Sequence, residues 1–161
     1  MIKYVEGDIL KSQAHAIAHG VAPNDDFKQG LALSLREQWP NLYKDFRHYC
    51  HTKNPKEGEV WAWKGPGGPI IFNLMTQEAP KTRDSHPGKA SLPNINHSLR
   101  NLVKALKEEN VETLAITKIA TGVGGLDWNE VKPLLEQYLS DAGIQVFVYE
   151  TYKKDVTAKE S

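Results

Sequence analysis

The sequence has 161 residues, of which 40% are hydrophobic and 25% are charged, a composition typical of a single folded domain with its own core. Its 20 basic and 20 acidic residues cancel, which argues against the net positive charge that drives nonspecific binding to nucleic acid. No apolar run approaches the roughly 20 residues needed to cross a bilayer. The N-terminus shows no secretory signal and Cys50 is the single cysteine, so we expect a cytoplasmic protein with no membrane partner.

The apolar pattern predicts strands and helices that alternate along the chain. Short strands are expected at 2–5, 14–19, 59–64, 69–76, 113–120 and 144–151, and helices at 30–39 and from residues 42, 93 and 128 onward. This alternation favours an α/β domain, residues 1–152, with a mixed, mostly parallel sheet and helices on both faces. Residues 153–161 lose hydrophobic periodicity, so we expect them to extend into solvent as a flexible tail.

The two middle strands, 59–64 and 69–76, are joined by the turn Gly-Pro-Gly-Gly and are expected to form a hairpin-like pair. The second strand is almost continuously apolar, which predicts burial on both faces. Trp61 and Trp63 share one face of the first strand, and we expect them to pack against the core rather than stack on a base. The polar, proline-interrupted segment 77–92 then predicts a long loop.

The segment Ile119–Trp128, IATGVGGLDW, places three glycines between a strand and a helix that Asp127 is expected to cap. Backbone amides next to glycines, with a helix dipole behind them, bind phosphate or pyrophosphate without a basic side chain. The glycine spacing matches neither GxGxxG nor GxxxxGK[ST]. The alternative is that these glycines make only a tight turn.

Two further segments follow predicted strands. His19–Ala32, HGVAPNDDFKQGLA, also enters a helix, and two such loops facing one another are able to hold a diphosphate from both sides. In Glu6–Leu10, EGDIL, the Asp8 carboxylate is placed to accept a hydrogen bond from an exocyclic amine such as that of adenine. The alternative for Asp8 is a turn aspartate that accepts from nearby amides. Tyr149 and Thr151 are placed to flank the same base.

With these segments in this order and spacing, the chain resembles the macrodomain family from about Ile2 to Thr151. It most resembles the branch that contains the terminal ADP-ribose glycohydrolase and the bacterial antitoxins that remove ADP-ribose from DNA. The resemblance implies a three-layer α/β/α fold whose partner is ADP-ribose or an ADP-ribosylated macromolecule, with nucleic acid only as a modified substrate. It also implies a ligand cleft formed by Asp8, Ile9, His19, Gly20, Phe27, Lys28, Gln29, Gly30, Leu31, Thr76, Gln77, Thr121, Gly122, Val123, Gly124, Gly125 and Tyr149.

Two departures from that branch concern catalysis. The branch places a lysine nucleophile after the strand where this chain has Gln77, and an aspartate in the loop where this chain has Gly124. A neutral amide cannot form the covalent adduct that an amine forms, so we do not expect the lysine mechanism.

Three functions therefore stay open. The first is a hydrolase that activates water, with Asp25, Asp26 and Gln77 as catalytic candidates and His19, Glu78 and His86 as nearby ionisable residues. The second is a noncatalytic reader of ADP-ribose. The third, an RNA or nucleotide-end binder, is disfavoured by the neutral charge. The histidines show no metal-ligand spacing, so no metal is predicted, and no cofactor is expected.

Overall fold

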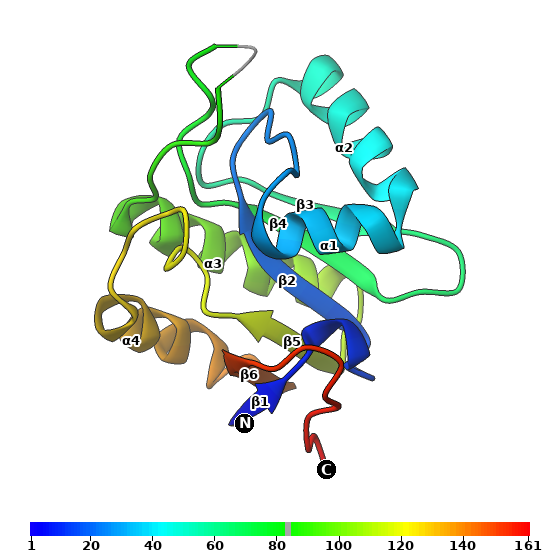
Figure 1. Cartoon of the computed structure of the whole chain (residues 1–161). Coiled ribbons are helices and arrows are strands. Elements are labelled where there is room, and N and C mark those ends of the chain that lie inside the picture. The colour runs from blue at the N-terminus through cyan, green and yellow to red at the C-terminus, as the bar shows by residue number, and fades with distance from the viewer. Residues whose placement is uncertain (83–84) are drawn as a thin grey trace.

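The computed structural model describes residues 1–82 and 85–161, in which strands and helices alternate along the chain (Figure 1). The strands are β1 (Ile2–Gly7), β2 (Ala16–Val21), β3 (Val60–Lys64), β4 (Ile70–Met75), β5 (Thr113–Thr117) and β6 (Gln145–Tyr152). The helices are η1 (Ile9–Lys11), α1 (Gly30–Gln38), α2 (Pro40–Lys53), α3 (Leu92–Glu108) and α4 (Trp128–Leu139). Arg83 and Asp84, which belong to the predicted loop 77–92, lie outside the described residues.

The six strands form one sheet in the order β1-β6-β5-β2-β4-β3. Every neighbouring pair is parallel except β3 and β4, which are antiparallel. The predicted mostly parallel sheet and the predicted hairpin are therefore both confirmed. The parallel strands end at the same edge of the sheet, where ligands bind in this class of fold.

The sheet lies between two helical layers, with α1 and α2 on one face and α3 and α4 on the other (Figure 1). Alternation along β2 produces this arrangement, because Ala16 and Ala18 pack toward α3 and α4 while Ile17 and Val21 pack toward α1 and α2. All six residues of β4 are buried, as its apolar pattern predicts. The three-layer α/β/α fold is confirmed.

Local side-chain contacts agree with several further predictions. The Asp127 carboxylate accepts a hydrogen bond from the Asn129 amide at 2.9 Å and so caps α4. The Trp61 ring stacks on Tyr49 with 5.0 Å between ring centres, and the Trp63 indole N–H donates to Asp45 at 2.8 Å. Both tryptophans therefore lie between the sheet and α2, in the packing role that was expected of them.

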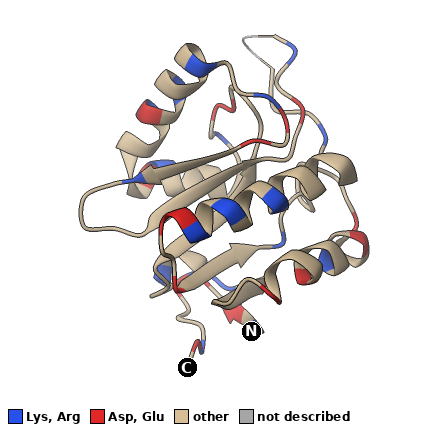
Figure 2. Ribbon diagram, turned by 180° about the vertical axis from the view of Figure 1, so that it is seen from behind, with Lys and Arg blue, Asp and Glu red and all other residues tan. Residues whose placement is uncertain are grey.

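On the side of α3 and α4, acidic and basic residues are mixed along the helices (Figure 2). This mixture follows from the balanced composition and gives this face no extended field of one sign. Among the described residues, no helix combines the length and the apolar character that crossing a bilayer requires.

Residues 153–161 were expected to extend into solvent, but they fold back against the start of the chain. The Asp8 amide donates to the Val156 carbonyl at 2.7 Å, and the Asp155 amide donates to the Asp8 carboxylate at 2.9 Å. Ala158 is buried at 8% exposure. Hydrophobic periodicity gave no sign of this docking because one small apolar residue and polar contacts hold the segment.

Candidate functional site

Two adjoining cavities form one cleft at the carboxyl edge of the sheet. One, of about 240 Å³, lies beside the end of β2 and the glycine-rich segment 120–125, and we call it the β2 half. The other, of about 600 Å³, lies beside η1 and the end of β6, and we call it the β6 half. The two halves share four lining residues, Gly30, Leu31, Thr117 and Lys118. Cavities of roughly 300–1,000 Å³ are typical of small-molecule sites.

Backbone amides without partners border the β2 half on two sides. On one side, no acceptor within residues 1–82 and 85–161 pairs with the N–H groups of Gly122, Val123 or Gly124. On the other side α1 begins at Gly30, and its cap residue Gln29 supplies no side-chain acceptor for the first helical amides. Both groups of donors line the same cavity, so they are placed to hold one anion between them.

Backbone hydrogen bonds fix the glycine-rich segment. The Gly125 amide donates to the Gly122 carbonyl and the Leu126 amide donates to the Ala120 carbonyl, each at 3.0 Å. A Cβ atom on Gly124 would lie 2.6 Å from the Ala120 carbonyl oxygen, whereas a Cβ atom on Gly122 would meet nothing within 4 Å. Glycine at 124 is therefore required by close packing within the turn, and Gly122 faces open space.

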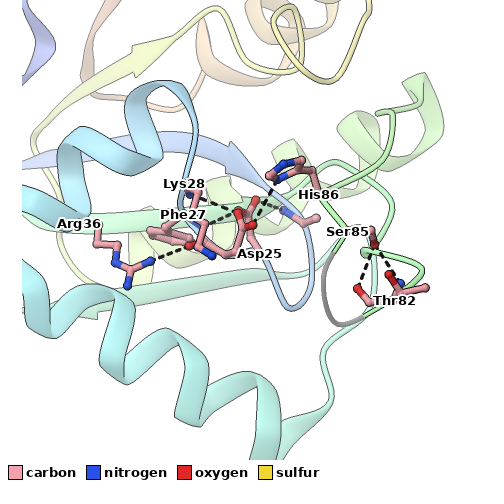
Figure 3. Close-up of polar contacts among 9 residues, drawn as sticks. Asp25, Phe27, Lys28, Arg36, Thr82, Ser85 and His86 are labelled. Carbon is pink, nitrogen blue, oxygen red and sulfur yellow. Dashed lines mark hydrogen bonds and ion pairs between the residues drawn. The ribbon is translucent and has the colours of Figure 1, made fainter.

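The loop between β2 and α1 is folded by Asp25 (Figure 3). Its carboxylate accepts hydrogen bonds from the Ala22 amide at 3.0 Å and from the Phe27 amide at 2.9 Å. These bonds hold Phe27 at a φ of 52°, with its side chain fully buried beside His19. Burial raises the pKa of Asp25 to about 6.

Asp26 lines the β2 half, and its contact with His86 places it next to the loop that follows β4. One carboxylate oxygen accepts from the Lys28 amide at 3.2 Å, and the other lies 3.3 Å from Nδ1 of His86. The Arg36 guanidinium donates to the Asp26 carbonyl oxygen at 2.9 Å. The structure thus brings an aspartate of the cleft lining and a histidine, 60 positions apart in the sequence, into contact.

His19 forms part of the wall of the β2 half and is buried. Its Nε2 atom lies 2.7 Å from Oδ1 of Asn73, whose own amide nitrogen donates to the Trp61 and Ile71 carbonyl oxygens. Since Oδ1 can only accept, Nε2 of His19 carries the proton. Burial lowers the pKa of His19 to about 4, so the imidazole is neutral at pH 7.

Thr76 and Gln77 end β4 near the same wall. Gln77 lines the β2 half, and its side-chain amide donates to the Gly88 carbonyl at 3.0 Å, which braces the loop. Thr76 is fully buried, and no partner for its hydroxyl occurs among residues 1–82 and 85–161. This hydroxyl lies 2.7 Å from the position of a Cβ atom on Gly20, so it lies behind the cleft wall.

The β6 half has walls from η1, α1 and β6. Ile9, Leu31 and Tyr149 supply apolar and aromatic surface to it. Asp8 is only 3% exposed and does not line either cavity, because its carboxylate accepts from the Leu10 amide at 3.0 Å and from the Asp155 amide at 2.9 Å. These contacts are those of the turn aspartate that the sequence left as an alternative.

Most of the ligand residues expected from the sequence come together in this cleft. Those that line it are Ile9, His19, Gly20, Gln29, Gly30, Leu31, Gln77, Thr121, Gly122, Val123, Gly124 and Tyr149. Those outside its lining are Asp8, Phe27, Lys28, Thr76 and Gly125. Which of them contact a ligand stays a prediction. Within the described residues, no three His, Cys, Asp or Glu side chains gather as a metal-binding group.

Lys118 and Ser34 also line the cleft, although neither was expected there from the sequence. Lys118 follows β5 directly and borders both halves, so its place after a strand that ends at the ligand edge was the available signal. Ser34 lies one helical turn beyond Gly30 on α1, on the face that the start of this helix presents to the cleft.

Comparison with known proteins gives relatives along nearly the whole chain. A DNA ADP-ribosyl glycohydrolase of Thermus aquaticus is 27% identical to this chain over 93% of the present sequence. Human ADP-ribose glycohydrolase OARD1 is 25% identical over 92% of this chain and 90% of its own length. The chain spans only 41% of the Thermus aquaticus protein and 43% of a Thermosipho africanus transferase-glycohydrolase fusion protein.

Solved structures agree with the fold. The macrodomain of Thermus aquaticus DarG superposes with a TM-score of 0.82 at 25% identity, covering 93% of this chain and 98% of that chain. Thermosipho africanus DarTG in complex with ADP-ribose gives a TM-score of 0.83 at 24% identity, covering 94% of this chain and 41% of that chain. The Macro domain family model matches residues 26–135, which is most of the sequence. This chain belongs to the macro domain family.

Proposed function

We propose that this chain binds ADP-ribose in the cleft and hydrolyses the bond that joins ADP-ribose to a substrate. The observation that carries the proposal is that two groups of unpartnered backbone amides, around Gly30 and around Gly122–Gly124, face one cavity. The names of the relatives, which are ADP-ribosyl and ADP-ribose glycohydrolases, support the same ligand and reaction.

The shape and chemistry of the cleft favour one orientation of the ligand. The diphosphate lies between the two groups of amides, where charge-assisted hydrogen bonds and the N-terminus of α1 stabilise its negative charge. Adenosine occupies the β6 half, against Ile9 and Tyr149. The second ribose then reaches the end of the β2 half that Asp25, Asp26 and Gln77 border.

For the reaction we assign the role of general base to Asp26, with His86, whose Nδ1 lies 3.3 Å from its carboxylate, as its partner. The Gln77 amide is neutral and already donates to Gly88, so it supplies no nucleophile. Asp25 is held by two backbone amides and serves to shape the loop. In the proposed step, a water oxygen bonds to C1 of the second ribose as the bond to the substrate breaks. The leaving group departs with the bonding electrons, and the water proton moves to Asp26.

The test begins with calorimetric titration of ADP-ribose. Chromatography then follows ADP-ribosylated protein, ADP-ribosylated DNA and O-acetyl-ADP-ribose after incubation with the protein. Asp26→Asn is expected to lower turnover roughly a hundredfold or more while the Kd for ADP-ribose stays close to that of wild type. Asp141→Asn, at an exposed turn, is the matched control. Absence of any affinity for ADP-ribose would contradict the proposed function.

A second candidate function is a reader that binds ADP-ribose without cleaving anything. The observation that favours it is Gln77, a neutral and hydrogen-bonded residue at the position implied for the nucleophile. Tight binding of ADP-ribose with no product from any of the three substrates would select the reader over the hydrolase.

The surface next to the cleft end suggests which macromolecule carries the modification. Lys44, Arg47 and His48 on α2 border a groove with Asn24, and a neighbouring groove continues past Lys28 toward the cleft end. We propose that ADP-ribosylated nucleic acid, whose phosphates complement these basic groups, is the modified substrate. A steep loss of affinity for modified DNA as salt rises, with a shallow slope for free ADP-ribose, is the expected result. Equal slopes would favour a modified protein.

A further inference from the structure

Glu160, near the end of the sequence, receives hydrogen bonds from two separate parts of the fold. One oxygen of its carboxylate accepts from the Ser12 hydroxyl at 2.6 Å and from the Tyr149 hydroxyl at 2.6 Å. The other oxygen accepts from the Gln13 amide at 3.1 Å. Burial and the hydrogen bond to Glu160 raise the pKa of Tyr149, so its phenol stays protonated as a donor. Three donors thus converge on one carboxylate.

The rest of the C-terminal segment packs closely behind η1. The Asp8 amide donates to Val156 at 2.7 Å, and the Asp8 carboxylate accepts from Asp155 at 2.9 Å. A Cβ atom on Gly7 would lie 2.8 Å from the Val156 carbonyl oxygen and 3.0 Å from the Ala158 Cβ. At this separation the segment supports the turn from β1 into η1 directly.

Both elements that this segment holds form walls of the β6 half. Ile9 and Leu10 line it from η1, and Tyr149 lines it from β6. The hydroxyl of Tyr149 points to Glu160, which is not part of the cavity lining. Glu160 therefore contacts Tyr149 from behind the wall, and it also holds Ser12 and Gln13, which directly follow the end of η1.

We propose that Glu160 is a positioning residue for the β6 half and that the segment 153–161 thereby sets the affinity of the cleft for the adenosine end of its ligand. The inference rests on the proposed function, because adenosine in the β6 half follows from ADP-ribose in the cleft. Glu160 acts through Tyr149 and the η1 turn. The amides of Gly122–Gly124 line the β2 half alone, and those around Gly30 border both halves. Within the described residues, Glu160 accepts no hydrogen bond from either group.

The experiment compares Glu160→Ala with wild type for three ligands. ADP-ribose and AMP carry the adenosine end, whereas ribose 5-phosphate has no base. The Kd for ADP-ribose and AMP is expected to rise by roughly threefold to thirtyfold, the effect of losing hydrogen bonds to one charged group. The affinity for ribose 5-phosphate, followed by NMR at the Gly122 and Gly124 amides, is expected to stay unchanged. Glu108→Ala on the exposed end of α3 is the matched control.

Each other outcome overturns the proposal. An unchanged Kd for AMP would show that the wall does not depend on Glu160. An equal loss for all three ligands would indicate general loosening of the fold. Should Glu160→Ala fail to fold, Glu160→Gln serves in its place. It keeps one acceptor oxygen, so it is expected to raise the Kd for AMP measurably but by less than complete removal of the carboxylate would. A Glu160→Gln protein with wild-type affinity for AMP would overturn it too. Wild-type protein that does not bind ADP-ribose would instead refute the proposed function.

Discussion

Acidification should reveal the buried, neutral state of His19 in the cleft wall. Burial lowers the pKa of His19 from 6.5 to about 4, whereas in the unfolded chain the imidazole titrates near its ordinary value. Between these two pH values the unfolded state binds more protons than the folded state. The free energy of unfolding that His19 contributes is therefore complete above pH 6.5 and is lost as the pH falls toward 4.

The titration of Asp25, in the same wall, changes the free energy of unfolding in the opposite direction. Burial raises its pKa from 3.8 to about 6, so the folded state binds more protons than the unfolded state between these values. Its contribution to the free energy of unfolding is complete below pH 3.8 and is lost as the pH rises through 6. At about 1.4 kcal/mol per pH unit, each residue contributes up to about 3 kcal/mol, so the two effects nearly cancel in the wild-type protein.

Urea unfolding of wild type, His19→Gln and Asp25→Asn at pH 7 and pH 4.5 separates the two effects. Relative to wild type, His19→Gln should gain about 2 kcal/mol in the free energy of unfolding on acidification, because only the Asp25 effect remains. Asp25→Asn should lose about 2 kcal/mol for the converse reason. Other titrating groups cancel in these differences. Parallel pH profiles for wild type and His19→Gln would refute the argument that this imidazole is held neutral.

Four further substitutions test the site and the core. Gly122→Ala places its methyl group in open space at the cleft and should raise the Kd for ADP-ribose about tenfold with little change in Tm. In Gly124→Ala the methyl group meets the Ala120 carbonyl, so this variant should lose about 1–3 kcal/mol of stability by urea unfolding. Equal effects of the two on Tm would contradict the loop geometry. Asp127→Ala removes the cap of α4 and should cost about 1 kcal/mol in the same assay, with an unchanged midpoint as the contrary result. Leu102→Ala leaves a cavity under α3 and should lower the free energy of unfolding by about 2–5 kcal/mol. A loss of less than about 1 kcal/mol would show that the surrounding side chains fill the cavity.

The fold was predictable because its signals are local. The apolar run 70–75 specified a strand buried on both faces, and Asp127 after the glycines marked the start of a helix. Residues 153–161 had no such signal, because their docking depends on contacts such as that of Asp155 with Asp8, 147 positions away. Periodicity reports which face of an element is apolar and carries no information on backbone contacts between the two ends of a chain.

The site was predictable to the extent that strand ends define it. The glycines after β5 and the start of α1 after β2 both line the cleft, since parallel strands end at one edge of a sheet. Phe27 was expected at the ligand. The hydrogen bonds that the Asp25 carboxylate accepts from the Ala22 and Phe27 amides instead turn the Phe27 backbone so that its side chain enters the core. No propensity predicts a positive φ at phenylalanine, because that conformation is unfavourable until the surrounding structure enforces it.

In the proposed function, binding and catalysis depend on different parts of the cleft. The proposed diphosphate donors are backbone amides whose positions are set by the hydrogen bonds from Gly125 to Gly122 and from Leu126 to Ala120, so side-chain substitutions elsewhere leave them in place. The proposed reacting end depends on the side chains of Asp26, Gln77 and His86, on two loops that meet through tertiary contacts. A chain can therefore keep glutamine where a nucleophile is expected and still hold the same ligand. Affinity for ADP-ribose by itself cannot separate the hydrolase from the reader, whereas the turnover of Asp26→Asn compared with wild type can.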